Sequence, residues 1–315
     1  MTNATLDKHR LGWIGLGRMG FPMAARLLKR GADLAVYNRT RSKATPLAPL
    51  GAKIVAQPAA LAECDIVFTM VSTSNDLLEV VSGPAGLLSA KGKAPKMIVD
   101  CSTVSEEASA KARAAAAASG TAFLAAPVSG NGKVVKAGRL SIVASGPRAA
   151  YDTAEPYLAA LGQGASYVGE GELARTVKIC HNVLLGVLAQ SLAEVTVLAE
   201  KAGVPRHAFL DFINNCVLGS TFSRYKTPAY VNLDFTPTFT PVLLLKDLDL
   251  GLSAARTLAV PMPVASTVRE IVQSLIGNGH VDCDFAALLL LEAQAAGLAL
   301  EPENVAVSDG LEGVA

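Results

Sequence analysis

The chain has 315 residues, of which 51% are hydrophobic and 17% are charged, and its formal net charge is +1. This composition excludes an intrinsically disordered chain, and the balanced charge provides no concentrated basic field for a nucleic acid. The length suits two domains of ordinary size.

The mean hydropathy is positive, so a membrane protein must be considered. The two most apolar windows, residues 183–197 and 285–300, contain acidic and amide side chains. They fall short of the roughly 20 clean apolar residues that a spanning helix needs. We therefore expect buried helices and no membrane partner.

The N-terminal segment MTNATLDKHR is polar and lacks the apolar stretch of an export signal. The five cysteines form no CxxC pair, and the four histidines form no metal-binding spacing. These features predict a cytoplasmic protein with reduced thiols and no metal site.

The first half of the chain alternates short apolar runs with helical segments. The predicted strands are residues 11–16, 34–37, 66–71, 97–100, 121–125 and 141–145, and the predicted helices are residues 19–30 and 108–119. Such alternation is typical of a parallel sheet with helices on both faces.

The second half is predicted to be helical. A proline-free segment, residues 172–202, ends before Gly203 and Pro205, which are normal helix-stop signals. Further helices are predicted at residues 207–215, 242–258, 264–277 and 284–297. We therefore predict an α/β domain over residues 1–169 and an all-helical domain over residues 170–315, joined by a long interdomain helix.

A glycine-rich turn follows the first predicted strand and opens the first predicted helix. Its sequence fits GxGxxG, whose glycines allow a tight turn, close approach of a pyrophosphate, and packing of helix on strand. The pyrophosphate would meet the free N–H groups of the helix N-terminus. The motif predicts a doubly wound, Rossmann-like dinucleotide-binding domain. The residues expected to contact the cofactor here are Gly15, Leu16, Gly17, Arg18, Met19 and Gly20.

The end of the second predicted strand bears on the choice of cofactor. An enzyme for NAD places an acidic residue there to bind the ribose 2′-hydroxyl, whereas this chain has Asn38, Arg39 and Thr40. Arg39 suits the 2′-phosphate of NADP, and Lys43 adds positive charge. The sequence favours NADP, with NAD as the alternative.

Five motifs in this order resemble the β-hydroxyacid dehydrogenase family, which includes 3-hydroxyisobutyrate dehydrogenases and tartronate semialdehyde reductases. They are IGLGRMGFPMA near the start, DCSTVS at residues 100–105, APVSGNG at 126–132, GELARTVKICHN at 171–182 and DFTPTFTPVLLLKDLDL at 234–250. The resemblance covers about residues 11–298. It implies hydride transfer between NADP and a small β-hydroxy acid or its semialdehyde, bound between the two domains.

The resemblance implies that Lys178 is the catalytic lysine and that Asn182 is its partner. The two residues are four apart, so a helix presents both on one side. A proton must reach the carbonyl oxygen as the hydride reaches the carbon, and burial would lower the lysine pKa towards neutrality. His181 stands where the family often has asparagine, and we expect it to point away from Asn182.

Other site residues are also implied by the resemblance. The loop that would bind the substrate carboxylate contains Ser129, Gly130 and Asn131, with Asn131 replacing a glycine common in the family. Ala125 likewise replaces a common aspartate. Further expected cofactor contacts are Val71, Ser72, Thr103 and Lys246, with Asp247 orienting Lys246.

Two other functions remain open, an NADPH-dependent imine reductase and a non-catalytic dehydrogenase-like scaffold. Lys178 disfavours both, because imine reductases typically have another residue there and the scaffolds lose the lysine. We also expect a homo-oligomer, a dimer or a tetramer built from dimers. The helix predicted near residues 285–298 is apolar around most of its circumference and needs cover on most sides.

Overall fold

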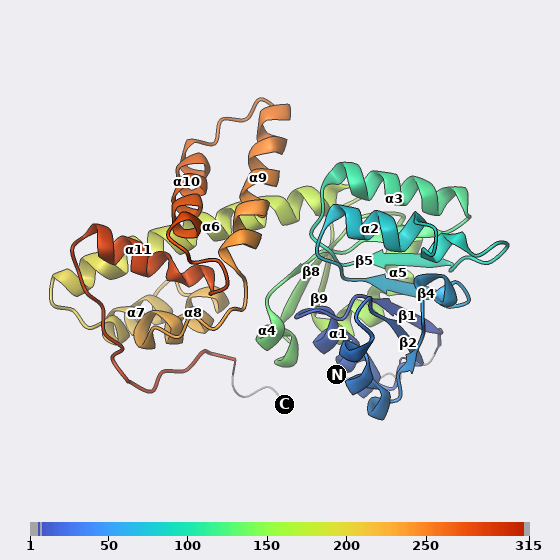
Figure 1. Ribbon diagram of the computed structural model, residues 1–315, viewed down its shortest axis with the longest axis horizontal. Helices are drawn as coiled ribbons and strands as arrows, with labels where there is room; N and C mark the ends of the chain where they lie inside the picture. The colour runs from blue at the N-terminus through green and yellow to red at the C-terminus, as the bar shows by residue number, and fades with distance from the viewer. Residues whose placement is uncertain (1–5, 7, 312–315) are drawn as a thin grey trace. The chain divides into compact units, whose positions relative to one another are not determined.

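The computed structural model describes residue 6 and residues 8–311 (Figure 1). The chain divides into two compact units, Met1–Lys178 and Ile179–Ala315, each with its own buried core. The division falls inside a long helix, whereas the predicted boundary at residue 169 lies before that helix begins.

A parallel sheet forms the centre of the first unit, with strand order β3-β2-β1-β4-β5-β6. Its strands are β1 (Leu11–Ile14), β2 (Leu34–Tyr37), β3 (Lys53–Ile54), β4 (Ile66–Thr69), β5 (Met97–Asp100) and β6 (Ala122–Ala125). Every residue of β1, β4 and β5 is buried, as expected for central strands covered on both faces. This strand order confirms the predicted Rossmann-like fold.

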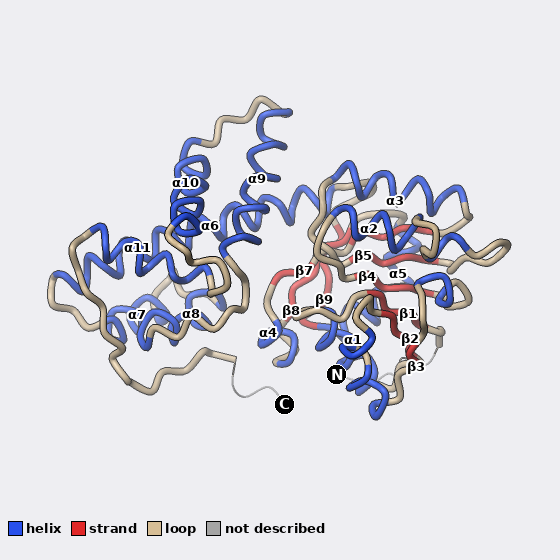
Figure 2. The backbone as a smooth tube through the Cα atoms, in the orientation of Figure 1, coloured by secondary structure: helices blue, strands red, loops and turns tan. Residues whose placement is uncertain are grey.

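Helices cover both faces of this sheet (Figures 1 and 2). On one face, Trp13 and Phe68 pack with buried residues of α1 (Gly20–Lys29) and α5 (Arg148–Leu161). On the other face, Ile14 and Val67 pack with α2 (Ser74–Ser82) and α3 (Glu106–Ala118). Neighbouring residues of a strand thus point to opposite faces of the sheet, because side chains alternate along a strand.

Smaller elements complete the first unit. A second sheet, ordered β7-β8-β9, consists of β7 (Val128–Ser129), β8 (Leu140–Ala144) and β9 (Gly162–Tyr167). The short helix α4 (Gly132–Lys136) connects β7 to β8. Short 3₁₀ helices lie between the main elements: η1 (Arg41–Lys43), η2 (Thr45–Leu50), η3 (Pro58–Leu61) and η4 (Leu87–Ser89).

Helices make up the regular structure of the second unit that the structure describes. They are the part of α6 (Leu173–Lys201) after Lys178, α7 (Arg206–Asn215), α8 (Thr221–Asn232), α9 (Pro241–Thr257), α10 (Pro263–Gly277), η5 (Phe285–Ala287) and α11 (Leu288–Ala295). This confirms the prediction of an all-helical C-terminal region. The segment 285–289 is buried within its own unit, which provides the cover that its apolar sequence was expected to need.

Helix α6 runs through the division between the units. Its buried positions recur every three or four residues and include Lys178, Asn182 and Gln190. Among the helices of the described residues, only α6 is long and apolar enough to cross a membrane, judged by length and composition alone. Buried charged and amide side chains fit a helix packed in protein better than one facing lipid.

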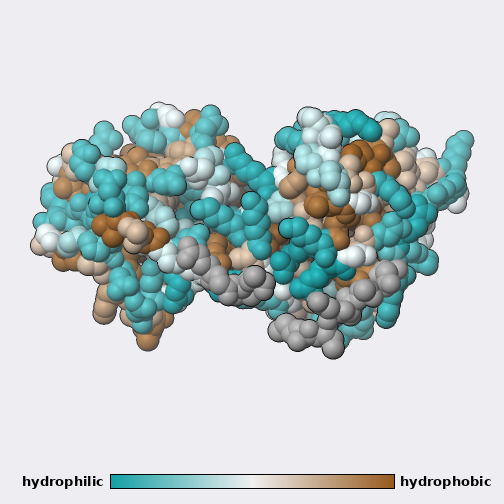
Figure 3. Space-filling model, turned by 90° about the horizontal axis from the view of Figure 1, so that it is seen from below, coloured by the Kyte–Doolittle hydropathy of each residue, from teal (hydrophilic) through white to brown (hydrophobic). Residues whose placement is uncertain are grey.

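Apolar side chains also reach the surface of the protein. Figure 3 shows hydrophobic side chains among the hydrophilic ones on the face that it presents. On α6, Leu184, Leu188, Val195 and Leu198 are all exposed. Scattered exposed leucines are ordinary, but four on one helix within four turns form an apolar strip.

Candidate active site

The glycine-rich turn has the geometry that a dinucleotide needs. Gly15 has φ of 96°, and a Cβ there would lie 2.2 Å from the carbonyl oxygen of Met70 on the loop after β4. Gly17 is exposed, and a Cβ there would meet nothing within 4 Å. The first turn of α1 contains no acidic residue. These features fit a pyrophosphate at the helix N-terminus, beside the point where the strand order reverses between β1 and β4.

Of the residues that follow β2, one is bonded to the glycine-rich turn and the others face solvent. The Asn38 Oδ1 accepts a hydrogen bond of 2.8 Å from the Leu16 N–H, and its Nδ2 donates to the Thr40 carbonyl at 2.9 Å. Asn38 therefore fixes the glycine-rich turn through its amide, a role that sequence reasoning missed. Arg39, Thr40 and Lys43 are all exposed and able to meet a phosphate.

An acidic residue from another element lies against Arg39. The Arg39 Nη1 is 3.3 Å from the Asp76 Oδ1, and the Arg39 side chain is 81% exposed. Asp76 also caps α2, because its Oδ2 accepts hydrogen bonds from the Thr73 N–H and hydroxyl. Ion pairs this exposed are worth little, so a phosphate can displace the carboxylate from Arg39.

The carboxyl ends of β4 and β5 bring the next expected residues together. The Val71 N–H donates 2.9 Å to the Ser102 hydroxyl, which donates 2.7 Å to the buried Asp100 carboxylate. This bond joins the loop after β4, with Val71 and Ser72, to the loop after β5, with Thr103. Both loops lie at the edge of the sheet where ligands of this fold bind.

The loop of Ser129, Gly130 and Asn131 lies between β7 and α4. The Asn131 Oδ1 accepts hydrogen bonds from the N–H groups of Lys133 and Val134 at 2.9 and 3.1 Å, which caps α4. The side chain is 6% exposed, and its Nδ2 has no hydrogen-bond partner among the described residues. A Cβ on the adjacent Gly132 would approach the Arg18 carbonyl at 3.2 Å, which puts this loop next to the glycine-rich turn.

Lys178 and Asn182 belong to the buried stripe of α6, with exposures of 8% and 3%. The expectation that one side of a helix carries both is thus confirmed. Asn182 Nδ2 donates 2.5 Å to Asp247 Oδ2, and Asn182 Oδ1 lies 2.8 Å from His181 Nδ1. The expectation that His181 points away from Asn182 was wrong. The Cα–Cβ bonds diverge by about 100° along a helix, but the His181 ring bends back to reach the amide.

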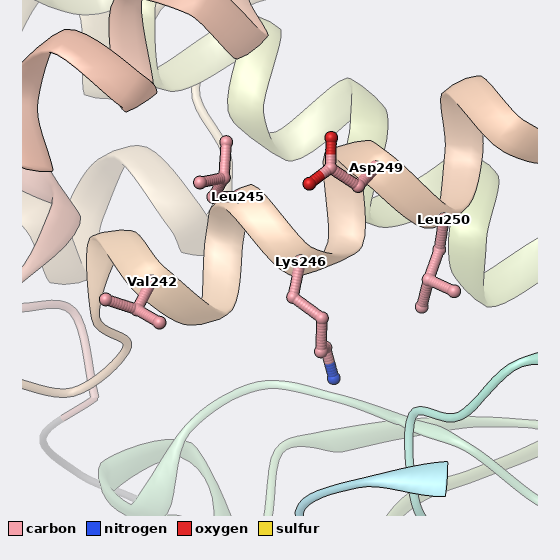
Figure 4. A pocket seen from close by; sticks show the side chains of 5 residues that line it. All are labelled: Val242, Leu245, Lys246, Asp249 and Leu250. Atoms are coloured by element: carbon pink, nitrogen blue, oxygen red, sulfur yellow. The ribbon is translucent and has the colours of Figure 1, made fainter.

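Lys246 and Asp247 lie on α9 in the second unit. The Lys246 Nζ is 3.3 Å from Asp247 Oδ1, and the Lys246 side chain is 33% exposed whereas that of Asp247 is 2% exposed. Lys246 lines a hollow of about 410 Å³ together with Val242, Leu245, Asp249 and Leu250. Figure 4 shows its ammonium group extending away from the helix axis, with Asp249 on the other side.

Comparison with known proteins identifies the family. The model for the NAD binding domain of 6-phosphogluconate dehydrogenase matches residues 10–169, and the model described as NAD-binding of NADP-dependent 3-hydroxyisobutyrate dehydrogenase matches residues 172–291. The chain belongs to the β-hydroxyacid dehydrogenase family. It is therefore an NAD(P)-binding oxidoreductase, as the order of its motifs predicted.

Individual members of the β-hydroxyacid dehydrogenase family match over most of their length. The chain is 30% identical to the chloroplastic glyoxylate/succinic semialdehyde reductase 2 of Arabidopsis thaliana, covering 91% of this chain and 80% of the relative. It is 32% identical to the 2-(hydroxymethyl)glutarate dehydrogenase of Eubacterium barkeri, covering 92% and 97%. The crystal structure of a 3-hydroxyisobutyrate dehydrogenase from Salmonella typhimurium matches with a TM-score of 0.80 at 26% identity, covering 89% and 99%.

Proposed function

We propose that this β-hydroxyacid dehydrogenase uses NADP and acts on a small β-hydroxy acid or the corresponding semialdehyde, with Lys178 as general acid and base. The observation that carries the proposal is the buried pair on α6. Lys178 is 8% exposed and lies one turn before Asn182, whose amide is held by Asp247. A lysine and an asparagine fixed on one side of a helix suit proton transfer to an oxygen.

The cofactor would be held by residues already described. The turn 15–20 and the N-terminus of α1 would bind the pyrophosphate, and Arg39, Thr40 and Lys43 would meet the 2′-phosphate. Asn38 supports the turn through its bond to Leu16. Val71, Ser72 and Thr103 would flank the nicotinamide end, and Lys246 would supply a further cationic contact. When bound, NADP(H) supplies or accepts the hydride.

Lys178 would donate or accept the proton that is transferred together with the hydride. In reduction its ammonium group donates a proton to the carbonyl oxygen as negative charge develops there. In oxidation its neutral amine removes the proton from the hydroxyl. Asn182 has two amide hydrogens, and Asp247 accepts from this group at 2.5 Å, which leaves one hydrogen for the substrate oxygen. Asp247 thus fixes the direction in which Asn182 donates.

The loop after β7 supports the proposed substrate class. Ser129 and Gly130 offer a hydroxyl and a backbone N–H to a carboxylate, and Asn131 adds its Nδ2 donor. A carboxylate at one end and a carbonyl or hydroxyl near Lys178 define a short aldehyde acid or hydroxy acid. The names of the relatives, a glyoxylate/succinic semialdehyde reductase and a 2-(hydroxymethyl)glutarate dehydrogenase, support the same class.

A reductase assay tests the proposal. The purified protein is offered NADPH or NADH with glyoxylate, succinic semialdehyde, tartronate semialdehyde and methylmalonate semialdehyde, and in parallel with cyclic imines. We expect cofactor oxidation with at least one aldehyde acid, faster with NADPH than with NADH. Turnover of cyclic imines alone, or no turnover of any aldehyde acid, would overturn the assignment.

A further inference from the structure

Arg175 lies on the first turn of α6, three residues before Lys178, and is 1% exposed. Its guanidinium contacts the end of β5, the loop after β5 and helix α3. Nη2 forms an ion pair with the Asp100 carboxylate, Nη1 donates to the Ser102 carbonyl, and Nε donates 3.1 Å to the Ser109 hydroxyl. Asp100 is 0% exposed, so both charges of this pair are buried.

The Asp100 side of this contact leads directly to the expected nicotinamide edge. Asp100 ends β5, and its Oδ1 accepts hydrogen bonds from the Thr69 hydroxyl at 2.6 Å and the Ser102 hydroxyl at 2.7 Å. The Ser102 hydroxyl in turn accepts from the Val71 N–H at 2.9 Å. A continuous set of hydrogen bonds therefore links α6 to the ends of β4 and β5.

Stability alone does not account for this arrangement. Buried ion pairs are often no more stabilising than apolar residues of similar volume, because the charges must be desolvated. What a planar guanidinium does provide is a fixed direction, since its donors form a rigid fork. Positions three apart lie on the same side of a helix, so a constraint on Arg175 also constrains Lys178.

We propose that Arg175 is a positioning residue that sets the location of Lys178 relative to the loops after β4 and β5. The inference rests on the proposed function, in which those loops hold the nicotinamide end and Lys178 transfers the proton. An error of about 1 Å in the placement of a reacting group can cost about 100-fold in rate. The guanidinium fixes that placement from within the first unit.

Other contacts keep α6 attached when Arg175 is removed. The Ala174 N–H donates 3.0 Å to the Ser145 hydroxyl, and Arg113 bonds to Glu172 at 2.8 Å and to the Gly171 carbonyl at 2.7 Å. These contacts reach the end of β8 and α3, but not the loops after β4 and β5. Removal of Arg175 is therefore expected to loosen the position of Lys178 without detaching the helix.

The kinetic test compares Arg175→Ala with Arg206→Ala. Arg206 is an equally buried arginine in the second unit, bonded to Glu200 and to the Tyr230 and Val231 carbonyls. We expect Arg175→Ala to lower kcat about 10- to 100-fold with the KM for NADPH within about threefold of wild type. Added guanidinium should restore part of the kcat. Arg206→Ala should lower Tm comparably while kcat stays within about threefold.

Arg175→Lys provides a second variant should the alanine protein fail to fold. It keeps the charge beside Asp100 but lacks the fork that also reaches Ser102 and Ser109, so kcat should still fall while Tm stays closer to wild type. Wild-type kcat in both Arg175 variants, or an equal loss of kcat in Arg206→Ala, would overturn the positioning role.

A labelling experiment separates this inference from the proposed function, because it needs no turnover. The rate at which an amine-reactive reagent modifies Lys178 is measured by mass spectrometry, with Lys226, 3% exposed in the second unit, as internal reference. In both Arg175 variants we expect Lys178 to react about tenfold faster than in wild type, with Lys226 unchanged. An unchanged Lys178 rate would refute the positioning role, whether or not the wild-type protein reduces aldehyde acids.

Discussion

At the scale of single residues, Arg39 and Asp76 bear on the choice of cofactor. The Arg39 guanidinium is 81% exposed and meets only a weak ion pair at 3.3 Å. Arg39→Ala should weaken NADPH binding by about 1.5–3 kcal/mol, the worth of a bond to a charged group, and leave NADH binding unchanged. Fluorescence titration with both cofactors measures these affinities.

Asp76→Asn is the control and should bind NADPH at least as tightly as the wild type. If Arg39→Ala instead loses the same affinity for NADPH and for NADH, Arg39 contacts the adenine or supports the fold and does not bind the 2′-phosphate.

Asn131 has a buried Nδ2 donor without a partner in the described structure, and such a group costs about 1–3 kcal/mol until it is satisfied. A substrate oxygen is the partner that the proposed function supplies. Asn131→Asp keeps the Oδ1 that caps α4 but replaces the donor by a negatively charged acceptor. The KM for the aldehyde acid should rise at least tenfold while NADPH affinity stays constant. An unchanged substrate KM would show that Asn131 serves only the cap.

At the scale of elements, a buried ion pair joins α8 to the start of η5. The Asp284 carboxylate is paired with Lys226 and accepts hydrogen bonds from the Thr238 hydroxyl and N–H at 2.6 and 3.0 Å. Burial alone would raise the pKa of Asp284, but Lys226, Thr238 and the Ala286 N–H together lower it below its ordinary value. The carboxylate therefore stabilises the fold above the unfolded pKa of about 3.9, and this contribution is lost as the pH falls through the lower folded pKa.

Asp284→Asn should therefore destabilise the helical unit at pH 7 by about 3 kcal/mol, because Lys226 is left buried without its counter-ion. The difference in free energy of unfolding between this variant and the wild type should shrink as the pH falls from 5 to 2. Urea unfolding followed by circular dichroism at 222 nm measures both. Glu63→Gln, an exposed carboxyl, is the control and should have little effect at either pH. If the free energies of unfolding of Asp284→Asn and the wild type differ by the same amount at every pH, this account is contradicted.

The sequence predicted β1, β2, β4, β5 and β6 of the main sheet because each is a short apolar run next to a glycine or a helix. It missed β3, whose two residues, Lys53 and Ile54, give no such pattern. It missed α5 and α8, which contain Pro156 and Pro228, residues that normally end helices. It also missed β9, whose six residues include Gly162 and Gly164 and are only partly buried. In these segments tertiary packing overrides the local signal.

Some features of the candidate site could be predicted from the sequence and others could not. The glycine turn and the spacing of Lys178 and Asn182 are local patterns, so the sequence predicted their arrangement. Arg175 gave no signal, because a charged residue on a helix is usually solvated and its partner Asp100 lies 75 residues away. The approach of Asp76 to Arg39 and of His181 to Asn182 depends on side-chain direction, which spacing alone does not determine.

At the scale of the whole molecule, the exposed face of α6 predicts self-association. Leu184, Leu188 and Leu198 are 57%, 47% and 69% exposed, more apolar surface than one helix usually leaves in water. A two-fold contact between copies would cover it most simply. Light scattering at micromolar concentration should give at least twice the chain mass of 32.5 kDa, and a double change of Leu184 and Leu188 to Glu should reduce it. A wild-type mass equal to one chain would refute the prediction.

Proton transfer by Lys178 is the central claim, and the turnover of Lys178→Gln tests it most directly. Glutamine keeps much of the side chain's length and removes the titratable amine. With an aldehyde acid that the wild type reduces, kcat should fall by about 10²–10⁴, the usual contribution of a general acid, while the dissociation constant for NADPH remains within about threefold of wild type. Retention of most of the wild-type kcat would contradict the account.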